Sequence, residues 1–228
     1  MLVATVYLSC GCGYGQFQTA RTTPKGKARV MMAQGVQFNE NTKEQTYRGF
    51  SVFNLPPQMD LRVGVSDRVD VGAKLLMISG LLLDTKVNLM PPSHNFALAL
   101  TGGVGVAIDT GSIGDGYDGT AWLLNLPIGL IASYRIGGWF SPYFGATYGF
   151  YWIFGRSLSY ELYNSDSDYA AREGYGDGLL RLTAGAELAT RKHVAFLVEY
   201  SFFWALVDDP GDNFAFVNNH LFGIGIAF

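Results

Sequence analysis

The sequence predicts an all-β protein, a transmembrane antiparallel up-and-down β-barrel most simply drawn with ten strands. Three observations predict it. Residues alternate with the two-residue period of a β-strand along most of the chain. The chain is 49% hydrophobic and only 15% charged, against about 25% charged in soluble domains. One face of the alternation is long and aromatic, and the other is mainly Gly, Ala, Ser and Thr, whereas a soluble β-sandwich has a strongly polar outer face.

Composition excludes several other classes of protein. A transmembrane helix needs about 20 consecutive apolar residues, and the stretch 122–131 is interrupted by Asn125, Pro127 and Gly129. A net charge of −3 without a clustered basic face gives no reason to expect nucleic acid as a partner. The Asp- and Gly-rich stretch 114–119 lacks the alternate-ligand spacing of a calcium loop. The sequence therefore predicts no cofactor and no metal.

Ten segments carry the strand pattern. A sheet in lipid must close, because an open edge would leave unpaired backbone groups. The outward positions are, in order, Ala28, Val30, Met32 and Val36; Met59, Leu61, Val63 and Val65; Val69, Val71, Ala73 and Leu75; Leu83, Thr85, Val87 and Leu89; Leu98, Leu100, Val104 and Val106; Trp122, Leu124, Leu126, Ile128 and Leu130; Phe144, Ala146, Tyr148, Phe150 and Trp152; Leu180, Leu182, Ala184, Ala186 and Leu188; Val194, Phe196, Val198, Tyr200, Phe202 and Trp204; and Phe222, Ile224, Ile226 and Phe228.

The connections also fit a membrane barrel, which has short periplasmic turns and longer external loops. If the first strand runs outward, all four periplasmic turns are short, and four of the five external connections are long. The exception, at residues 79–82, leaves eight or twelve strands as alternatives. The predicted turns are 66–68, 90–95, 135–138 and 190–193, and the predicted external connections are 39–56, 79–82, 109–119, 156–176 and 208–214.

The amino-terminal residues 1–26 are interpreted as a leader remnant and periplasmic segment, and residues 27–228 as the barrel domain. A short apolar run ends at Cys10, and Cys12 follows. Each cysteine follows a small residue, as at a lipidation site. The alternatives are that one of them is acylated, or that both belong to a leader that is removed.

The carboxyl terminus resembles the signature of bacterial outer-membrane proteins. Phe222, Ile224, Ile226 and Phe228 occupy alternate positions up to the last residue. The resemblance implies recognition by the barrel-assembly machinery. Residues 18–26, which follow a cysteine and open into the first strand, resemble small outer-membrane barrel lipoproteins, whose functions are generally undefined. This resemblance implies the outer membrane of a Gram-negative bacterium. The expected partners are membrane lipid, lipopolysaccharide and other envelope proteins.

Charged residues on the inward face form the main candidate site. Buried charges are costly unless they are paired, and ten strands leave little free bore once side chains are counted. The interpretations are a salt-bridged plug or a pore for small solutes. The predicted lumen charges are Arg29, Asp60, Arg62, Asp70, Lys74, Asp84, Lys86, Arg181, Glu187 and Glu199.

The predicted function is a non-enzymatic barrel with a plugged or narrow charged lumen and a structural or envelope-assembly role. A narrow solute channel is one alternative. A lipid-modifying enzyme is another, with His220 near Asp208 or Asp209 as its one catalytic candidate, and no serine stands where a nucleophile is needed. Surface binding through the tyrosine-containing loop 157–175 is a third. No catalytic residue is assigned.

Overall fold

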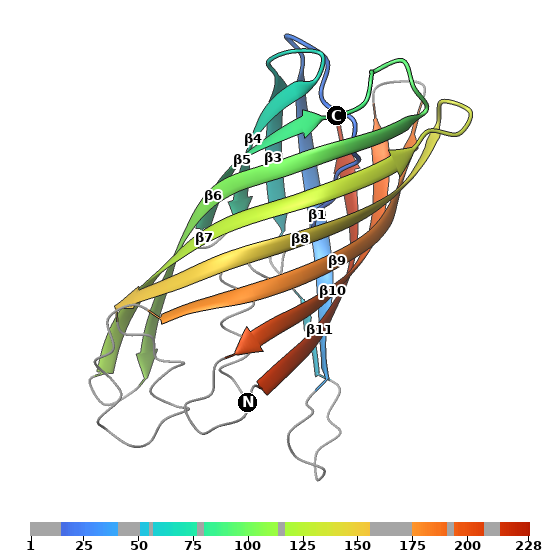
Figure 1. Ribbon diagram of the computed structural model, residues 1–228. Coiled ribbons are helices and arrows are strands. Elements are labelled where there is room, and N and C mark those ends of the chain that lie inside the picture. The colour runs from blue at the N-terminus through green and yellow to red at the C-terminus, as the bar shows by residue number, and fades with distance from the viewer. Residues whose placement is uncertain are drawn as a thin grey trace.

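The computed structural model describes residues 15–40, 51–54, 57–76, 80–113, 117–155, 175–190, 194–207 and 215–228. Most of these residues lie in long, inclined β-strands that wrap around a common axis (Figure 1). The strands are β1 (Ala28–Glu40), β2 (Ser51–Asn54), β3 (Gln58–Gly64), β4 (Val69–Leu76), β5 (Gly80–Asn88), β6 (Phe96–Ile113), β7 (Tyr117–Tyr134), β8 (Phe140–Gly155), β9 (Tyr175–Ala189), β10 (Ala195–Val207) and β11 (Ala215–Ala227).

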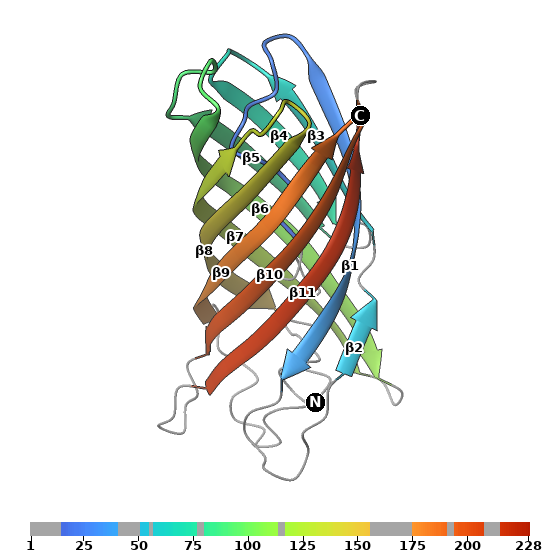
Figure 2. The same ribbon diagram turned by 90° about the vertical axis from the view of Figure 1, so that its right-hand side faces the viewer.

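The strands form one closed antiparallel barrel. From β3 to β11, each strand pairs with its neighbours in sequence, and β11 pairs with β1 to close the sheet (Figure 2). The closing register runs from Met31 opposite Ala227 to Glu40 opposite Asn218. The predicted up-and-down barrel is confirmed.

Two consecutive segments, β2 and β3, share one place in the barrel wall. Both pair with β1, so the barrel has ten strands around its circumference, as predicted. Pro56 and Pro57 stand between the two segments, and proline cannot donate a backbone hydrogen bond. The sequence predicts a connection over 39–56, but residues 51–54 of that range form a strand that pairs with β1. The prolines interrupt the alternation and hide this part of the strand from the sequence pattern.

The hairpin between β6 and β7 also departs from the prediction. The sequence predicts a connection over residues 109–119, but β6 continues to Ile113 and β7 begins at Tyr117, directly opposite it. Glycine and aspartate are typical of loops, and here their backbones pair in a ladder that extends the hairpin.

Side chains alternate between the outer wall and the lumen. On β7, Ile128 and Leu130 are 52% and 47% exposed on the outside, whereas Ile131 is completely buried in the lumen. No described part of the chain forms a helix that is long and apolar enough to cross a membrane.

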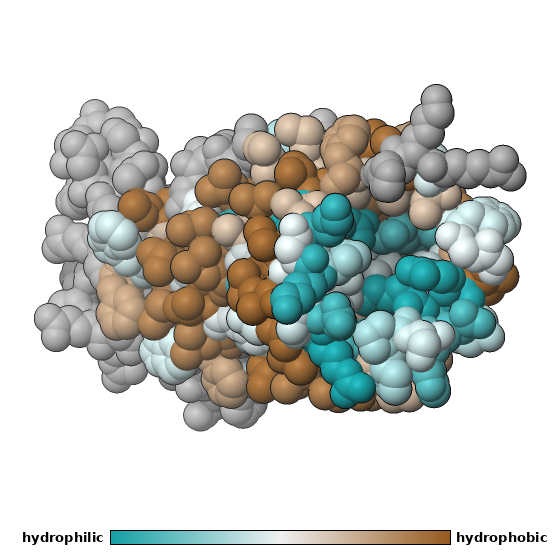
Figure 3. All heavy atoms as spheres, turned by 90° about the horizontal axis from the view of Figure 1, so that it is seen from above, coloured by the Kyte–Doolittle hydropathy of each residue, from teal (hydrophilic) through white to brown (hydrophobic). Residues whose placement is uncertain are grey.

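Three short turns, β3–β4, β5–β6 and β7–β8, lie with the carboxyl terminus at one end of the barrel, the upper end in Figures 1 and 2. We call it the short-turn end. In the β7–β8 turn, Gly137 and Gly138 have φ values of +60° and +78°, which glycine adopts without strain. Seen from this end, hydrophilic residues gather on one part of the surface, and hydrophobic residues cover the adjoining wall (Figure 3).

Candidate functional site

Residues 15–23 lie inside the barrel, and we call them the lumen segment. Gln16, Phe17, Thr19 and Ala20 are 1%, 3%, 3% and 0% exposed. The side chains that they contact by hydrogen bonds come from β4, β5, β7 and β10. Contacts to strands around the barrel place the segment within the lumen, not against one wall.

The lumen segment reaches the short-turn end. The Thr22 hydroxyl donates to the Asp67 carbonyl in the β3–β4 turn at 3.0 Å. The Arg21 guanidinium donates to the His94 carbonyl in the β5–β6 turn at 2.6 Å. The chain then reverses at Gly26, whose φ is +71°, and enters β1.

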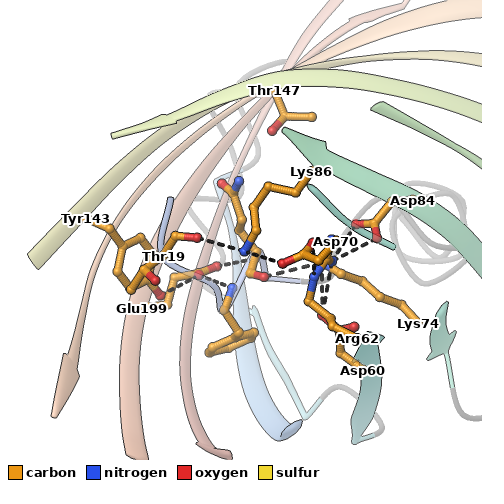
Figure 4. Close-up of polar contacts among 12 residues, drawn as sticks. Thr19, Asp60, Arg62, Asp70, Lys74, Asp84, Lys86, Tyr143, Thr147 and Glu199 are labelled. Atoms are coloured by element: carbon orange, nitrogen blue, oxygen red, sulfur yellow. Dashed lines mark hydrogen bonds and ion pairs between the residues drawn. The ribbon is translucent and has the colours of Figure 1, made fainter. Parts of the chain in front are cut away.

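Six charged side chains from β3, β4 and β5 form a network on one wall of the lumen (Figure 4). None of them exposes more than 7% of its side chain. Arg62 lies at the centre, because its guanidinium is 2.6 Å from Asp70 and 2.8 Å from Asp84. Three aspartates balance three basic residues, so the formal charges cancel. We call this network the wall cluster, and its members are Asp60, Arg62, Asp70, Lys74, Asp84 and Lys86.

Strand register and one glycine assemble the wall cluster. Asp60 lies opposite Lys74, and Asp70 lies opposite Lys86. Gly72 pairs with Arg62 on one side and with Asp84 on the other. A Cβ atom at Gly72 would lie 2.7 Å from Arg62 Nη1 and 2.5 Å from Asp84 Oδ1. The glycine therefore lets the Arg62 side chain cross β4 to reach a carboxylate on β5.

The wall cluster binds the backbone of the lumen segment. Each lysine keeps an aspartate partner, Lys86 at 3.5 Å from Asp70 and Lys74 at 3.9 Å from Asp60. Both lysines also donate to the segment, and Asp70 accepts from it (Figure 4). These hydrogen bonds are Lys74 Nζ to the Gln16 carbonyl (3.3 Å), Lys86 Nζ to the Thr19 carbonyl (3.1 Å) and the Thr23 N–H to Asp70 Oδ2 (2.8 Å).

Glu199 on β10 holds the segment from the other side of the lumen. Its carboxylate is 1% exposed and accepts the backbone N–H groups of Gln16, at 2.5 Å, and Phe17. The Tyr143 and Ser201 hydroxyls donate to it at 2.8 and 3.1 Å. Within the described part of the chain, Glu199 forms no ion pair with a basic side chain. Four hydrogen bonds, two of them from the segment, therefore satisfy this buried carboxylate.

Packing also anchors the segment, mainly through the Phe17 ring, with a smaller contact at Ala20. Phe17 is buried with Met31, Ala33 and Leu197 on the lumen face of β1 and β10. A Cβ atom at Gly223 would lie 2.3 Å from Phe17 Cζ. The small lumen residues of β11 therefore make room for this ring.

Two further wall glycines lie where the segment passes. A Cβ atom at Gly145 would lie 2.2 Å from Gln16 Oε1. A Cβ atom at Gly64 would lie 2.4 Å from the carbonyl oxygen of Thr23, the last residue of the segment. The lumen wall is thus shaped to the chain that runs through it.

The other predicted lumen charges lie outside the wall cluster. Arg29 and Glu187 form a separate pair at 2.7 Å, with side chains 26% and 15% exposed. Arg181 donates to the Thr147 hydroxyl of β8 at 3.3 Å. The structure thus divides the ten predicted residues into the wall cluster, Glu199, this pair and Arg181.

The remaining predicted positions face outward or lie outside the described residues. Phe222 and Ile224 on β11 are 46% and 57% exposed, Ile226 is half-buried, and Phe228, directly after β11, is 56% exposed. Cys10 and Cys12 lie outside the residues that the structure describes.

His220 lies on the outer wall in an aromatic group. Its Nδ1 is 2.5 Å from the Tyr200 hydroxyl, and its ring contacts Phe202 with centroids 5.2 Å apart. Asp208 and Asp209 are outside the described residues. Among the residues with described positions, no group of His, Cys, Asp and Glu could hold a metal ion.

Sequence reasoning missed the lumen segment and its uncharged partners. The sequence assigns residues 1–26 to a periplasmic segment, and nothing in their pattern indicates that residues 15–23 enter the lumen. Tyr143 and Ser133 occupy inward positions, but a hydroxyl on the polar face of a strand is not by itself informative. The available signal was Glu199, an inward carboxylate on a strand with no inward basic residue.

Comparisons with known proteins find a likeness in structure only. No family model and no curated protein matches the chain. The matched structures are bacterial outer-membrane barrel proteins. They include the attachment invasion locus protein Ail of Yersinia pestis (12% identity, 90% of this chain and 99% of that chain, TM-score 0.40), the outer membrane protease OmpT of Escherichia coli (12%, 88% and 95%, 0.44) and the outer membrane protein OprG of Pseudomonas aeruginosa (10%, 92% and 99%, 0.36).

Proposed function

We propose that this protein is a non-enzymatic barrel of the Gram-negative outer membrane whose lumen is closed by its own lumen segment, with a structural or assembly role among envelope proteins. One observation carries the proposal. The lumen segment is held by the wall cluster on one side and by Glu199 on the other. A segment tied to both sides occupies the space that a solute would need.

The outer wall supports a place in a membrane. On β7, Trp122 and Tyr134 are 49% exposed at each end of an outward series that includes Ile128 and Leu130. A strand of that length, tilted by about 45°, covers a height of about 28 Å, close to the apolar band of an outer-membrane barrel. Aromatic residues at both edges suit the two interfaces.

The expected partners follow from this placement. The apolar wall would contact lipid, and the external end would contact lipopolysaccharide. The alternate residues Phe222, Ile224, Ile226 and Phe228 would serve as the recognition signal for the barrel-assembly machinery.

Single-channel recording in a planar bilayer tests closure. The full-length protein, shown to be folded by its heat-modifiable mobility on a gel, should give no current. Discrete salt-dependent steps that change when Lys74→Glu or Lys86→Glu reverses an inner charge would instead establish a small-solute channel.

A variant that releases the segment makes a silent record interpretable. Glu199→Ala removes the acceptor of two segment N–H groups and should produce openings. Glu187→Ala is the matched control, because Glu187 pairs with Arg29 and makes no hydrogen bond to the lumen segment among the described contacts. Openings in both variants would mean that current arises from general loosening of the barrel.

A further inference from the structure

The lumen wall recognises the backbone of the segment more than its sequence. Within the described part of the chain, the hydrogen bonds between wall side chains and residues 15–23 use backbone groups of the segment, apart from contacts to the turns at its end. The wall groups that make them belong to five residues on four strands. The backbone groups are the N–H groups of Gln16, Phe17, Ala20 and Thr23 and the carbonyl groups of Gln16 and Thr19.

Phe17 supplies the largest packing contact of the segment, and the small Ala20 packs with Ala97, Ala99, Ile131 and Tyr143. Phe17 is 3% exposed against the lumen face of β1, β10 and β11, beside the space left at Gly223. Backbone hydrogen bonds combined with one or a few side-chain anchors are how proteins bind extended peptides.

The same wall groups would lack partners if the segment left. Glu199 would lose two of its four donors, and Lys74 and Lys86 would each lose a carbonyl acceptor. A buried carboxylate without its donors is costly. The wall is therefore complementary to peptide groups in general, and a second peptide could satisfy it as the first does.

We propose that the half of the lumen next to the short-turn end is a binding site for a short peptide with one aromatic side chain. Residues 15–23 occupy this site as a ligand within the chain, and a polypeptide segment of the same chemistry can replace them. This adds a peptide-binding activity to the proposed closure. It does not depend on whether the barrel conducts ions.

Cutting the chain after folding tests exchange with the complete protein present. A specific protease site is inserted between Gly26 and Lys27, in an exposed turn where a Cβ atom at Gly26 would have no atom within 4 Å. The folded protein is cleaved in detergent, and a fluorescent peptide of residues 14–24 is added in excess. Fluorescence anisotropy should show saturable binding to the cleaved protein.

The uncleaved protein is the first control. It should bind the labelled peptide far more weakly, because its own segment is tethered at a high effective concentration. Equal binding to cut and uncut protein would indicate adsorption of the peptide outside the lumen and would overturn the proposal.

Modified peptides test the recognition while the protein stays unchanged. Phe17→Ala in the peptide should weaken binding at least tenfold. Replacing the Phe17 amide by an ester removes the N–H that Glu199 accepts and should weaken binding by about tenfold or more. The matched control is the same ester at Gln18, whose N–H donates no hydrogen bond among the described residues, and this peptide should bind almost normally.

Two results would overturn the proposal directly. The cleaved segment could stay in place indefinitely against excess peptide, which would make it a permanent part of the fold. Alternatively, all peptides could bind equally, which would exclude recognition through Phe17 and the backbone. Neither result bears on conductance, so the failure of this proposal and the failure of closure are distinguishable.

Discussion

Arg62 organises more of the lumen than any other described side chain in the wall cluster. Its guanidinium donates through Nε and Nη2 to Asp70 and through Nη1 to Asp84. This planar group presents several donors in a fixed fork, whereas a lysine ammonium is a single point of charge. Arginine is therefore the residue that can join carboxylates from two different strands.

Removing Arg62 should be strongly destabilising. Arg62→Ala leaves Asp70 and Asp84 without their shared cation, and breaking a buried ion pair in this way costs about 3–5 kcal/mol. The stability of Arg62→Lys should fall between those of the unchanged protein and Arg62→Ala. The measurement is equilibrium unfolding by guanidinium chloride in detergent or lipid vesicles, followed by tryptophan fluorescence.

Arg68 provides the matched control for Arg62. It lies in the exposed β3–β4 turn, and Arg68→Ala should change stability by less than about 0.5 kcal/mol. Similar unfolding midpoints for the two alanine variants would mean that the wall cluster contributes no net stability.

Residue identity in the lumen was partly predictable. The two-residue period correctly separates Asp60 and Arg62, whose side chains are buried, from Leu61, which is 48% exposed. It cannot show that Arg62 passes over Gly72 to reach Asp84, because that contact depends on three strands meeting in register.

At the scale of elements, Gly64 at the end of β3 controls the fit of the lumen segment. A Cβ atom there would lie 2.2 Å from the Pro24 carbonyl oxygen and 2.4 Å from that of Thr23. Both neighbours are backbone atoms, so no side-chain rotation relieves the clash. Gly64→Ala should displace the segment and leave the barrel strands paired.

Cysteine reactivity measures this displacement. In a protein with Cys10 and Cys12 replaced by serine, Thr19→Cys places a thiol at a position that is 3% exposed. We expect Gly64→Ala to accelerate its reaction with a maleimide at least tenfold. Gly102→Ala is the control, because the nearest atom to a Cβ there is 4.0 Å away. Equal protection in both variants would show that the segment tolerates the added methyl group.

The elements differ in how far the sequence could predict them. Strands such as β10 and β11 can be predicted from the sequence, because alternate residues meet different surroundings along their whole length. The lumen segment has no period, since its backbone contacts side chains such as Lys74 and Ser133 that are far away in the sequence. The sequence pattern did not reveal that the barrel position of β3 continues through residues 51–54, because Pro56 and Pro57 interrupt the alternation.

For the whole molecule, the cost of a charge on the outer wall depends on whether the barrel spans a membrane. Ile128 lies midway between Trp122 and Tyr134 on β7 and is 52% exposed. In a lipid vesicle, Ile128→Arg should lower the free energy of unfolding by about 2–4 kcal/mol, while Tyr134→Arg at the edge should lower it by about 0–1 kcal/mol. Reversible unfolding from vesicles checks both values.

The opposite order of these two variants, or no effect of either, would contradict a membrane placement with Ile128 at mid-depth.

The barrel class itself was predictable from the sequence, because closure and two contrasting faces affect every strand. The path of residues 15–23 was not, because it belongs to the finished barrel and to no single strand.

The attachment of the lumen segment to Glu199 has a consequence for assembly. The two hydrogen bonds join residues that are 183 and 182 positions apart, so they cannot form until β10 is in place. Contacts this distant form late, because the entropy of closing a long loop must be overcome first. Before that moment Phe17, which is 3% exposed in the finished barrel, has no lumen around it, and chymotrypsin should cut after Phe17 in barrels trapped before closure but not in finished ones. Finished and unfinished barrels should therefore differ in their sensitivity to proteolysis at this one residue, so that a protease that cuts after Phe17 would distinguish the two states.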